Sequence, residues 1–269
     1  MYEFDDIHLD LLRLAHADVI VRSVGHVAFD ECRQLMAEQP VSFLTAAAHV
    51  SLSEETLRSA SKVELSFRTT EAHGLIMYSR GAVGADGLHE RVFAVLLLDE
   101  HLFVALDAEQ PVRLVKVSAD EHAVNDGRTH ALTVARDEDH WTVVLDDVTR
   151  NIDATQSSSA LGLGSSVHLG GVKSSADEQL LQQTLPTAMF VPGFVGCVTS
   201  LRFDDVSVDL ALLLGERQHS DVIGMCEGGA VEQCVSAPCR HGGACAEGWT
   251  EFSCDCASTG FTGPTCDQG

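Results

Sequence analysis

The stretch Gly193-Phe194-Val195-Gly196-Cys197-Val198-Thr199-Ser200-Leu201-Arg202-Phe203-Asp204-Asp205 decides the fold. Its alternation is typical of a strand with one buried face, and the final Asp-Asp pair predicts a turn. The alternation predicts two sheet faces, one formed by Val198, Ser200 and Arg202 and the other by Cys197, Thr199, Leu201 and Phe203. The cysteine in this strand needs a partner, and the nearest candidate is Cys226.

Length and charge limit the classes of protein that the chain can belong to. The 269 residues suffice for one large domain and something small. The formal net charge of −23 would repel phosphate backbones and anionic lipids, so it argues against nucleic acids, membrane surfaces and sulfated glycans as ligands. No apolar run approaches the roughly 18–20 residues that span a bilayer. The acidic N-terminus is not typical of a signal peptide.

The cysteines are typical of a secreted protein, because seven of the nine lie after residue 225. Such a framework without a signal peptide predicts a piece of a longer protein. A sequence repeat supports this interpretation: Asp6–Leu14 resembles Asp205–Leu213, and each copy is followed by a cysteine, Cys32 or Cys226. Residues 1–32 are therefore expected to be the end of a preceding domain, with Cys32 unpaired in this chain. The alternative is a chance match of leucines and aspartates.

Short strand patterns dominate between residues 40 and 205, and glycine-rich or Asn-Asp-Gly turn signals separate them. Strands of this length and spacing predict a β-sandwich. Helical periodicity is scarce, and single turns are expected only at 53–60 and 210–214. The clearest strand patterns are Val63–Thr69, His101–Asp107, Leu114–Val117, His130–Val134, Trp141–Leu145 and Val167–Leu169.

The last part of the chain follows a different pattern, Cys234-x4-Cys239-x5-Cys245-x8-Cys254-x-Cys256-x9-Cys266. A segment of about 35 residues cannot bury enough apolar surface by itself, so disulfides must hold it together. Six cysteines allow 15 different pairings, and the spacing alone leaves these open.

These patterns carry a family resemblance. The six-cysteine segment resembles an EGF-like module, which implies the pairs Cys234–Cys245, Cys239–Cys254 and Cys256–Cys266. The larger segment resembles a laminin G (LNS) domain, which implies an all-β, two-sheet jelly-roll sandwich. The matching pieces of the larger segment are Ser66–Thr70, Gly74–Ile76, Val124–Gly127, His168–Gly171 and Phe194–Cys197.

The order of these modules resembles the neurexin family. That resemblance implies the tail of one laminin G domain in 1–32, a whole laminin G domain in 33–226 and an EGF-like domain in 230–267. It also implies an extracellular ectodomain of a single-pass membrane protein, so the membrane would be reached only through a part of the full-length protein outside this chain. Agrin-like, contactin-associated-like, slit-like and crumbs-like proteins share these modules and stay open.

Many laminin G domains hold calcium at one rim through an aspartate and backbone carbonyls. The position that matches this acid is Arg91, with Glu90 beside it, so no metal site and no cofactor are assigned and calcium is disfavoured. The EGF-like module also departs from the calcium-binding subclass, because Glu247 stands where that subclass has Asp or Asn. By contrast, Cys234-Val235-Ser236-Ala237-Pro238-Cys239 fits the pattern for O-glucosylation at Ser236.

Catalytic patterns are missing from the sequence. The histidines form no His-Glu-x-x-His motif, and neither a dinucleotide loop nor a Gly-x-Ser-x-Gly elbow occurs. The chain is therefore expected to be no enzyme. The resemblance implies a fragment of a cell-adhesion or synaptic receptor ectodomain that binds extracellular or cell-surface proteins and acts as a spacer. The alternative is a calcium-dependent, glycan-binding laminin G module of an extracellular-matrix protein.

Overall fold

The computed structural model describes residues 39–83, 90–106, 113–119, 121–154, 158–172, 174–185, 191–214, 221–226, 228 and 233–269. Residues 36–269 form one compact unit. The predicted domain remnant 1–32, and with it Cys32, lies outside the described residues.

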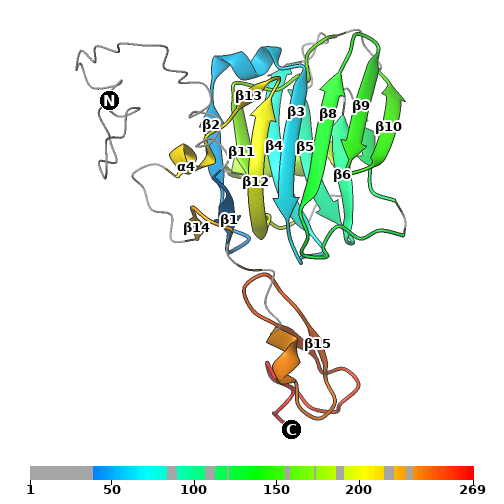
Figure 1. The fold of residues 1–269 in the computed structure, drawn as a ribbon, viewed down its shortest axis with the longest axis vertical. Coiled ribbons are helices and arrows are strands. Elements are labelled where there is room, and N and C mark those ends of the chain that lie inside the picture. The colour runs from blue at the N-terminus through cyan, green and yellow to red at the C-terminus, as the bar shows by residue number, and fades with distance from the viewer. Residues whose placement is uncertain are drawn as a thin grey trace, which may run out of the picture. The chain divides into compact units, whose positions relative to one another are not determined.

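Two antiparallel sheets face each other in the larger part of this unit (Figure 1). One has the strand order β10-β9-β8-β3-β12-β1-β14, with β13 paired to β12, and the other has the order β2-β11-β4-β5-β6-β7. The strands of the first sheet are β1 (Val41–Phe43), β3 (Lys62–Arg68), β8 (His130–Arg136), β9 (His140–Leu145), β10 (Val148–Asp153), β12 (Gly196–Phe203), β13 (Val206–Ser207) and β14 (Val222–Ile223).

The second sheet consists of β2 (Val50–Ser53), β4 (Gly74–Val83), β5 (Glu90–Leu98), β6 (His101–Leu106), β7 (Arg113–Lys116) and β11 (Ser166–Leu169). A small hairpin, β15 (Ala244–Ala246) with β16 (Ser253–Asp255), belongs to the C-terminal module. The described helices are η1 (Glu55–Ser59), α3 (Ser175–Thr184), α4 (Leu210–Leu213) and η3 (Gln233–Ser236). The predicted all-β sandwich with a small disulfide-rich module is confirmed.

Most of the stretch Gly193–Asp205 forms β12, a central strand of the first sheet, and the turn after it lies at Asp204 and Asp205 as predicted. The predicted alternation is wrong at one point. The register between β12 and β3 shifts between Val198 and Ser200, which marks a β-bulge. Because the bulge adds a residue, Val198 joins Leu201 and Phe203 in the core between the sheets.

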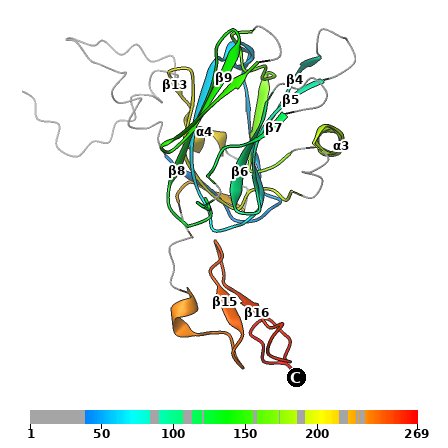
Figure 2. The same ribbon diagram turned by 90° about the vertical axis from the view of Figure 1, so that its right-hand side faces the viewer.

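The second sheet is buried on both faces, which was not predicted from the sequence. Its inner face contributes Phe93, Val95 and Leu97 to the core between the sheets. Its outer face carries a second apolar cluster that contains Leu96 and, from α3, Leu181. Figure 2 shows α3 beside this sheet, outside the sandwich. Burial on both faces explains why β5 is apolar almost without interruption.

The expectation that the chain forms only single helical turns is wrong, because α3 spans ten residues. Its N-cap residue is Ser174, whose hydroxyl accepts a hydrogen bond from the Asp177 backbone N–H at 3.2 Å and donates to the Asp177 carboxylate at 2.7 Å. Ser174 thus caps the first turn of the helix, and a serine at this position is a signal that the sequence does contain. The amphipathic pattern of Ser175–Thr184 is too short to reveal the helix by periodicity.

Candidate functional site

The pieces of sequence that carry the laminin G resemblance meet at one end of the sandwich, called here the junction end, where β3 finishes and β12 begins. The Thr69 hydroxyl donates to the Val195 carbonyl at 2.7 Å, and the Thr69 carbonyl accepts from the Gly127 N–H at 3.0 Å. The Arg68 Nε donates to the Gly127 carbonyl at 3.0 Å. These contacts join three segments that are far apart in the sequence, so they serve to hold this end together.

The residues at the position expected for calcium do not fit that ion. Arg91 lies on β5, and a side-chain Cβ added to Gly162 would stand 3.7 Å from its guanidinium nitrogen. A fixed positive charge against this loop opposes a second cation. Within the described ranges, no group of three or more histidine, cysteine, aspartate or glutamate residues could hold a metal ion.

The structure joins Cys197 to Cys226, with 5.5 Å between their Cα atoms. The chain that approaches Cys226 is also held to β1, because β14 pairs with β1 and the Ser42 hydroxyl donates to the Met225 carbonyl at 2.7 Å. The disulfide and these contacts determine where the chain leaves the sandwich, which is at the junction end.

In the C-terminal module the structure pairs Cys234 with Cys245, Cys239 with Cys254 and Cys256 with Cys266, the pairing that the EGF-like resemblance implies. The Glu247 carboxylate accepts hydrogen bonds from the backbone N–H groups of Cys234 at 2.8 Å and Gln233 at 3.2 Å. Glu247 thus ties the start of the module to the residues that follow β15.

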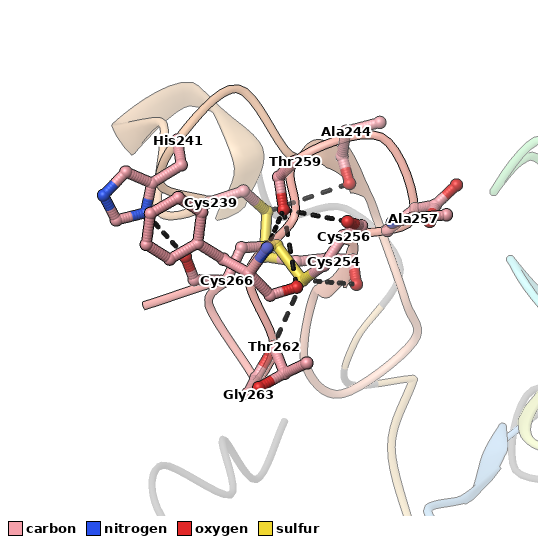
Figure 3. Close-up of a disulfide and its surroundings, with 12 residues drawn as sticks. Cys239, His241, Ala244, Cys254, Cys256, Ala257, Thr259, Thr262, Gly263 and Cys266 are labelled. Carbon is pink, nitrogen blue, oxygen red and sulfur yellow. Dashed lines mark hydrogen bonds between the residues drawn. A yellow bond between two sulfur atoms is a disulfide. The ribbon is translucent and has the colours of Figure 1, made fainter. Parts of the chain in front are cut away.

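Side-chain contacts replace a core in this module, as Figure 3 shows around the disulfides. The His241 Nδ1 lies 2.8 Å from the Cys266 carbonyl, and the His241 ring stacks on Phe261 with 3.6 Å between centroids. The Thr259 hydroxyl donates to the Cys256 carbonyl at 2.8 Å and accepts from the Phe261 N–H at 3.0 Å. The predicted O-glucosylation residue, Ser236, is exposed on η3.

The opposite end of the sandwich is acidic. Here β8, β10 and β12 end and β3 and β9 begin, as their antiparallel registers require. We define the acidic rim by the exposed carboxylates at this end, which are those of Glu54, Glu55, Asp137, Glu138, Asp139, Asp153 and Asp205.

Two of the described cations at the acidic rim are already engaged. Arg58 lies 3.0 Å from Glu55, and Lys62 lies 3.3 Å from Asp205. The hydrogen bond to Asp205 and the nearby charge of Glu64 raise the pKa of Lys62. The net charge alone does not locate these carboxylates, although the run Asp137-Glu138-Asp139 in the sequence is a signal for this acidic end.

Asp204 ties the turn after β12 to the start of β3. Its carboxylate accepts from the Ser61 hydroxyl at 2.7 Å, the Ser61 N–H at 2.9 Å and the Lys62 N–H at 3.0 Å. Desolvation by burial acts to raise the pKa of Asp204, but the hydrogen bonds from Ser61 and Lys62 outweigh it. The resulting pKa of Asp204 lies below its ordinary value.

Replacing Asp204 by asparagine is expected to lower the free energy of unfolding at neutral pH by about 1–2 kcal/mol. Because the folded-state pKa of Asp204 is lowered, its contribution is present above the unfolded pKa of about 3.9 and is lost as the pH falls through the folded pKa. Denaturant unfolding between neutral and acidic pH should therefore show the wild type and the Asp204→Asn variant converging in acid. A constant difference between them would contradict this role. The matched control is Asp205→Asn, since the Asp205 side chain is 90% exposed.

Comparison with known protein families agrees with this architecture. The profile described as "Laminin G domain" matches residues 67–206, slightly over half of the chain, and the profile described as "EGF-like domain" matches residues 234–265. Among solved structures, the LG1-3 region of the laminin alpha2 chain superimposes with a TM-score of 0.51 at 21% identity. This match covers 70% of the chain and 30% of that structure, and it supports the fold alone.

Curated relatives extend the similarity over the whole length. Neurexin-2 from Homo sapiens is 35% identical over 277 aligned residues and Neurexin-3a from Danio rerio is 32% identical over 276, each covering 100% of the chain. The chain spans 16% of the length of each of these relatives. In the part of the chain that the structure describes, no helix is long and apolar enough to cross a membrane.

Laminin G and EGF-like domains are non-catalytic binding modules of extracellular, adhesion-type proteins, so the chain is no enzyme. The all-β sandwich, the disulfide-rich module and the profile matches lead to one assignment: the chain belongs to the laminin G domain family, carries an EGF-like domain after its laminin G domain, and is similar to neurexins along its full length.

Proposed function

We propose that this chain is part of a cell-surface adhesion receptor of the synaptic type. In this proposal the laminin G sandwich binds an extracellular protein at the acidic rim, and the EGF-like module acts as a spacer that leaves from the junction end. The remainder of the protein would anchor the chain to the cell as the ectodomain of a single-pass membrane protein.

The separation of the two ends of the sandwich carries this proposal. The junction end is occupied by structural contacts and by the Cys197–Cys226 disulfide. The acidic rim carries no disulfide in the described residues, and it presents exposed carboxylates mostly on loops and turns, where binding residues tend to lie. Its charge would favour a partner with a basic surface.

The partner can be sought by capture from the secretome and from cell-surface ectodomains, with the chain as bait. We expect a captured protein to be lost when the rim charge is reversed by Glu138→Lys together with Asp139→Lys. The matched control is Asp147→Lys with Glu121→Lys, because Asp147 and Glu121 are exposed acids at the junction end. Equal capture by both double variants would contradict binding at the acidic rim.

The alternative function is that of a calcium-dependent, glycan-binding laminin G module. A glycan array probed with and without calcium distinguishes it from protein binding. Glycan binding that requires calcium would favour an extracellular-matrix lectin over a protein-binding receptor. Arg91 argues against that outcome, because it stands where the laminin G resemblance implies a calcium-binding aspartate.

Expression in a secretory host is expected to add one hexose at Ser236. The residue is exposed, and its hydroxyl donates a single hydrogen bond, to the Gln233 carbonyl at 3.0 Å, so a transferase can reach it. Intact-mass analysis of the peptide from Cys234 to Cys239 measures the modification, and Ser236→Ala is the control. An unmodified peptide from such a host would refute this prediction.

A further inference from the structure

Trp249 is buried where a small module offers little to bury it. It lies in the loop between β15 and β16, yet its side chain is 1% exposed and ranks among the largest fully buried side chains of the described residues. A module held together by disulfides has no core of its own large enough to enclose an indole. Residues outside the hairpin must therefore cover it.

The covering residues come from the laminin G sandwich. The Trp249 backbone N–H donates to the Glu71 carboxylate at 3.2 Å, and the Arg68 guanidinium carbon lies 5.7 Å from the centroid of the indole ring. Arg68 ends β3, and Glu71 follows it on the way to β4. A guanidinium over an indole face is an attractive pair, and it is stronger when the pair is shielded from water.

The sandwich residues in this contact are held in place by other hydrogen bonds of the laminin G domain. The Arg68 Nε donates to the Gly127 carbonyl at 3.0 Å, which orients the guanidinium. The Glu71 N–H donates to the Thr69 hydroxyl at 3.0 Å, and that hydroxyl donates to Val195. Both groups that meet Trp249 are therefore fixed by the core of the laminin G domain.

The connecting segment completes the enclosure. Gly228 has a φ of +106°, and a Cβ at this position would lie 2.5 Å from the Trp249 carbonyl oxygen and 2.8 Å from Nε1. Only glycine allows the backbone to pass so close to the indole. Two residues earlier, Cys226 is bonded to β12 by the disulfide, so the segment is anchored beside the contact.

We propose that Trp249 locks the EGF-like module onto the laminin G domain, so that the two tumble as a single body. The lock consists of Arg68 and Glu71 on the sandwich, Gly228 on the connection and Trp249 on the module. This inference rests on the spacer role proposed above and deepens it, because a spacer transmits position only if its first joint is stiff. Partner binding at the acidic rim could fail while the lock holds, and the reverse is equally possible.

The indole nitrogen gives the lock a specific signature. Trp249 Nε1 is buried and has no hydrogen-bond partner among the described residues. A buried donor without a partner is unfavourable, so the ring contributes through its area and its face and not through its N–H. Phenylalanine at this position should consequently preserve the lock, whereas alanine should abolish it.

Nitrogen-15 relaxation of the full chain tests the proposal. In the wild type and in Trp249→Phe, amides of residues 233–269 should report the same rotational correlation time as amides of the sandwich. In Trp249→Ala, the module should lose this shared value and report a shorter correlation time. A shorter time in the wild-type module, or an unchanged time in Trp249→Ala, would overturn the lock.

A second pair of variants covers the case in which Trp249→Ala disturbs the module itself. Glu71→Ala removes the acceptor on the sandwich side and leaves the module's sequence intact, while Glu71→Gln retains an acceptor oxygen. We expect Glu71→Ala to shorten the module's correlation time and Glu71→Gln to leave it unchanged. Identical behaviour of the two Glu71 variants would count against the lock, and neither variant alters the acidic rim.

Discussion

Replacing Phe194 by alanine is expected to lower the free energy of unfolding of the sandwich by about 3–5 kcal/mol. The side chain is fully buried, and its ring makes edge contacts with Phe43 at 6.1 Å and Phe67 at 6.3 Å between centroids. These two rings belong to β1 and β3, so Phe194 connects strands on both sides of β12. Alanine would leave a cavity and remove both aromatic contacts.

The surroundings of Phe194 cannot collapse easily to fill that cavity. A Cβ on Gly74 would lie 3.1 Å from the Phe194 backbone, and one on Gly196 would lie 2.5 Å from its ring, so the backbone already packs closely there. Denaturant unfolding followed by far-ultraviolet circular dichroism measures the loss. The matched control is Val206→Ala, because Val206 is 71% exposed and should change stability by less than about 0.5 kcal/mol. A loss below about 1 kcal/mol for Phe194→Ala would contradict the structure.

Removing the Cys197–Cys226 disulfide is expected to cost about 3–4 kcal/mol by the chain-entropy model. The two cysteines are 29 residues apart in sequence, so their link closes a loop long enough to restrict the unfolded chain substantially. The double variant Cys197→Ser with Cys226→Ser avoids an unpaired thiol, and Cys32→Ser in both proteins prevents new pairing with that residue.

Loss of the same disulfide should also change the packing around Trp249 in the EGF-like module. Since Cys226 anchors the chain just before Gly228, its release should loosen the segment that packs on Trp249. Unfolding experiments under oxidising conditions measure the stability loss, and tryptophan fluorescence in a Trp141→Phe background reports the environment of Trp249. A stability loss under about 1 kcal/mol would show that the hydrogen bonds to β1 suffice to hold this segment.

The sequence was enough to predict the class of the protein, because class depends on local patterns. The alternation in β3, β8 and β9 reflects burial on one side of a strand, which is a property of the residues themselves. The six-cysteine spacing indicated a disulfide-framed module, since a segment of that length has few other routes to stability. The family resemblance then supplied the pairing, which spacing alone left open.

Other features depended on contacts between distant residues. The bulge in β12 moved Val198 to the core face, because pairing with β3 required an extra residue that no pattern within the strand reveals. The helix α3 forms where its leucines find the outer face of the second sheet, a surface created only by folding. The acidic rim likewise gathers carboxylates from four places that are separated in the chain.

Trp249 shows most clearly which features the sequence determines and which depend on the tertiary structure. From the sequence it is one aromatic residue between two cysteines, and its position in the EGF-like module is all that the pattern determines. Only the tertiary structure places Arg68, Glu71 and Gly228 around it. The physical reason is that periodicity and spacing record which residues need burial or bonding, whereas the partner that satisfies a residue is chosen by the fold as a whole.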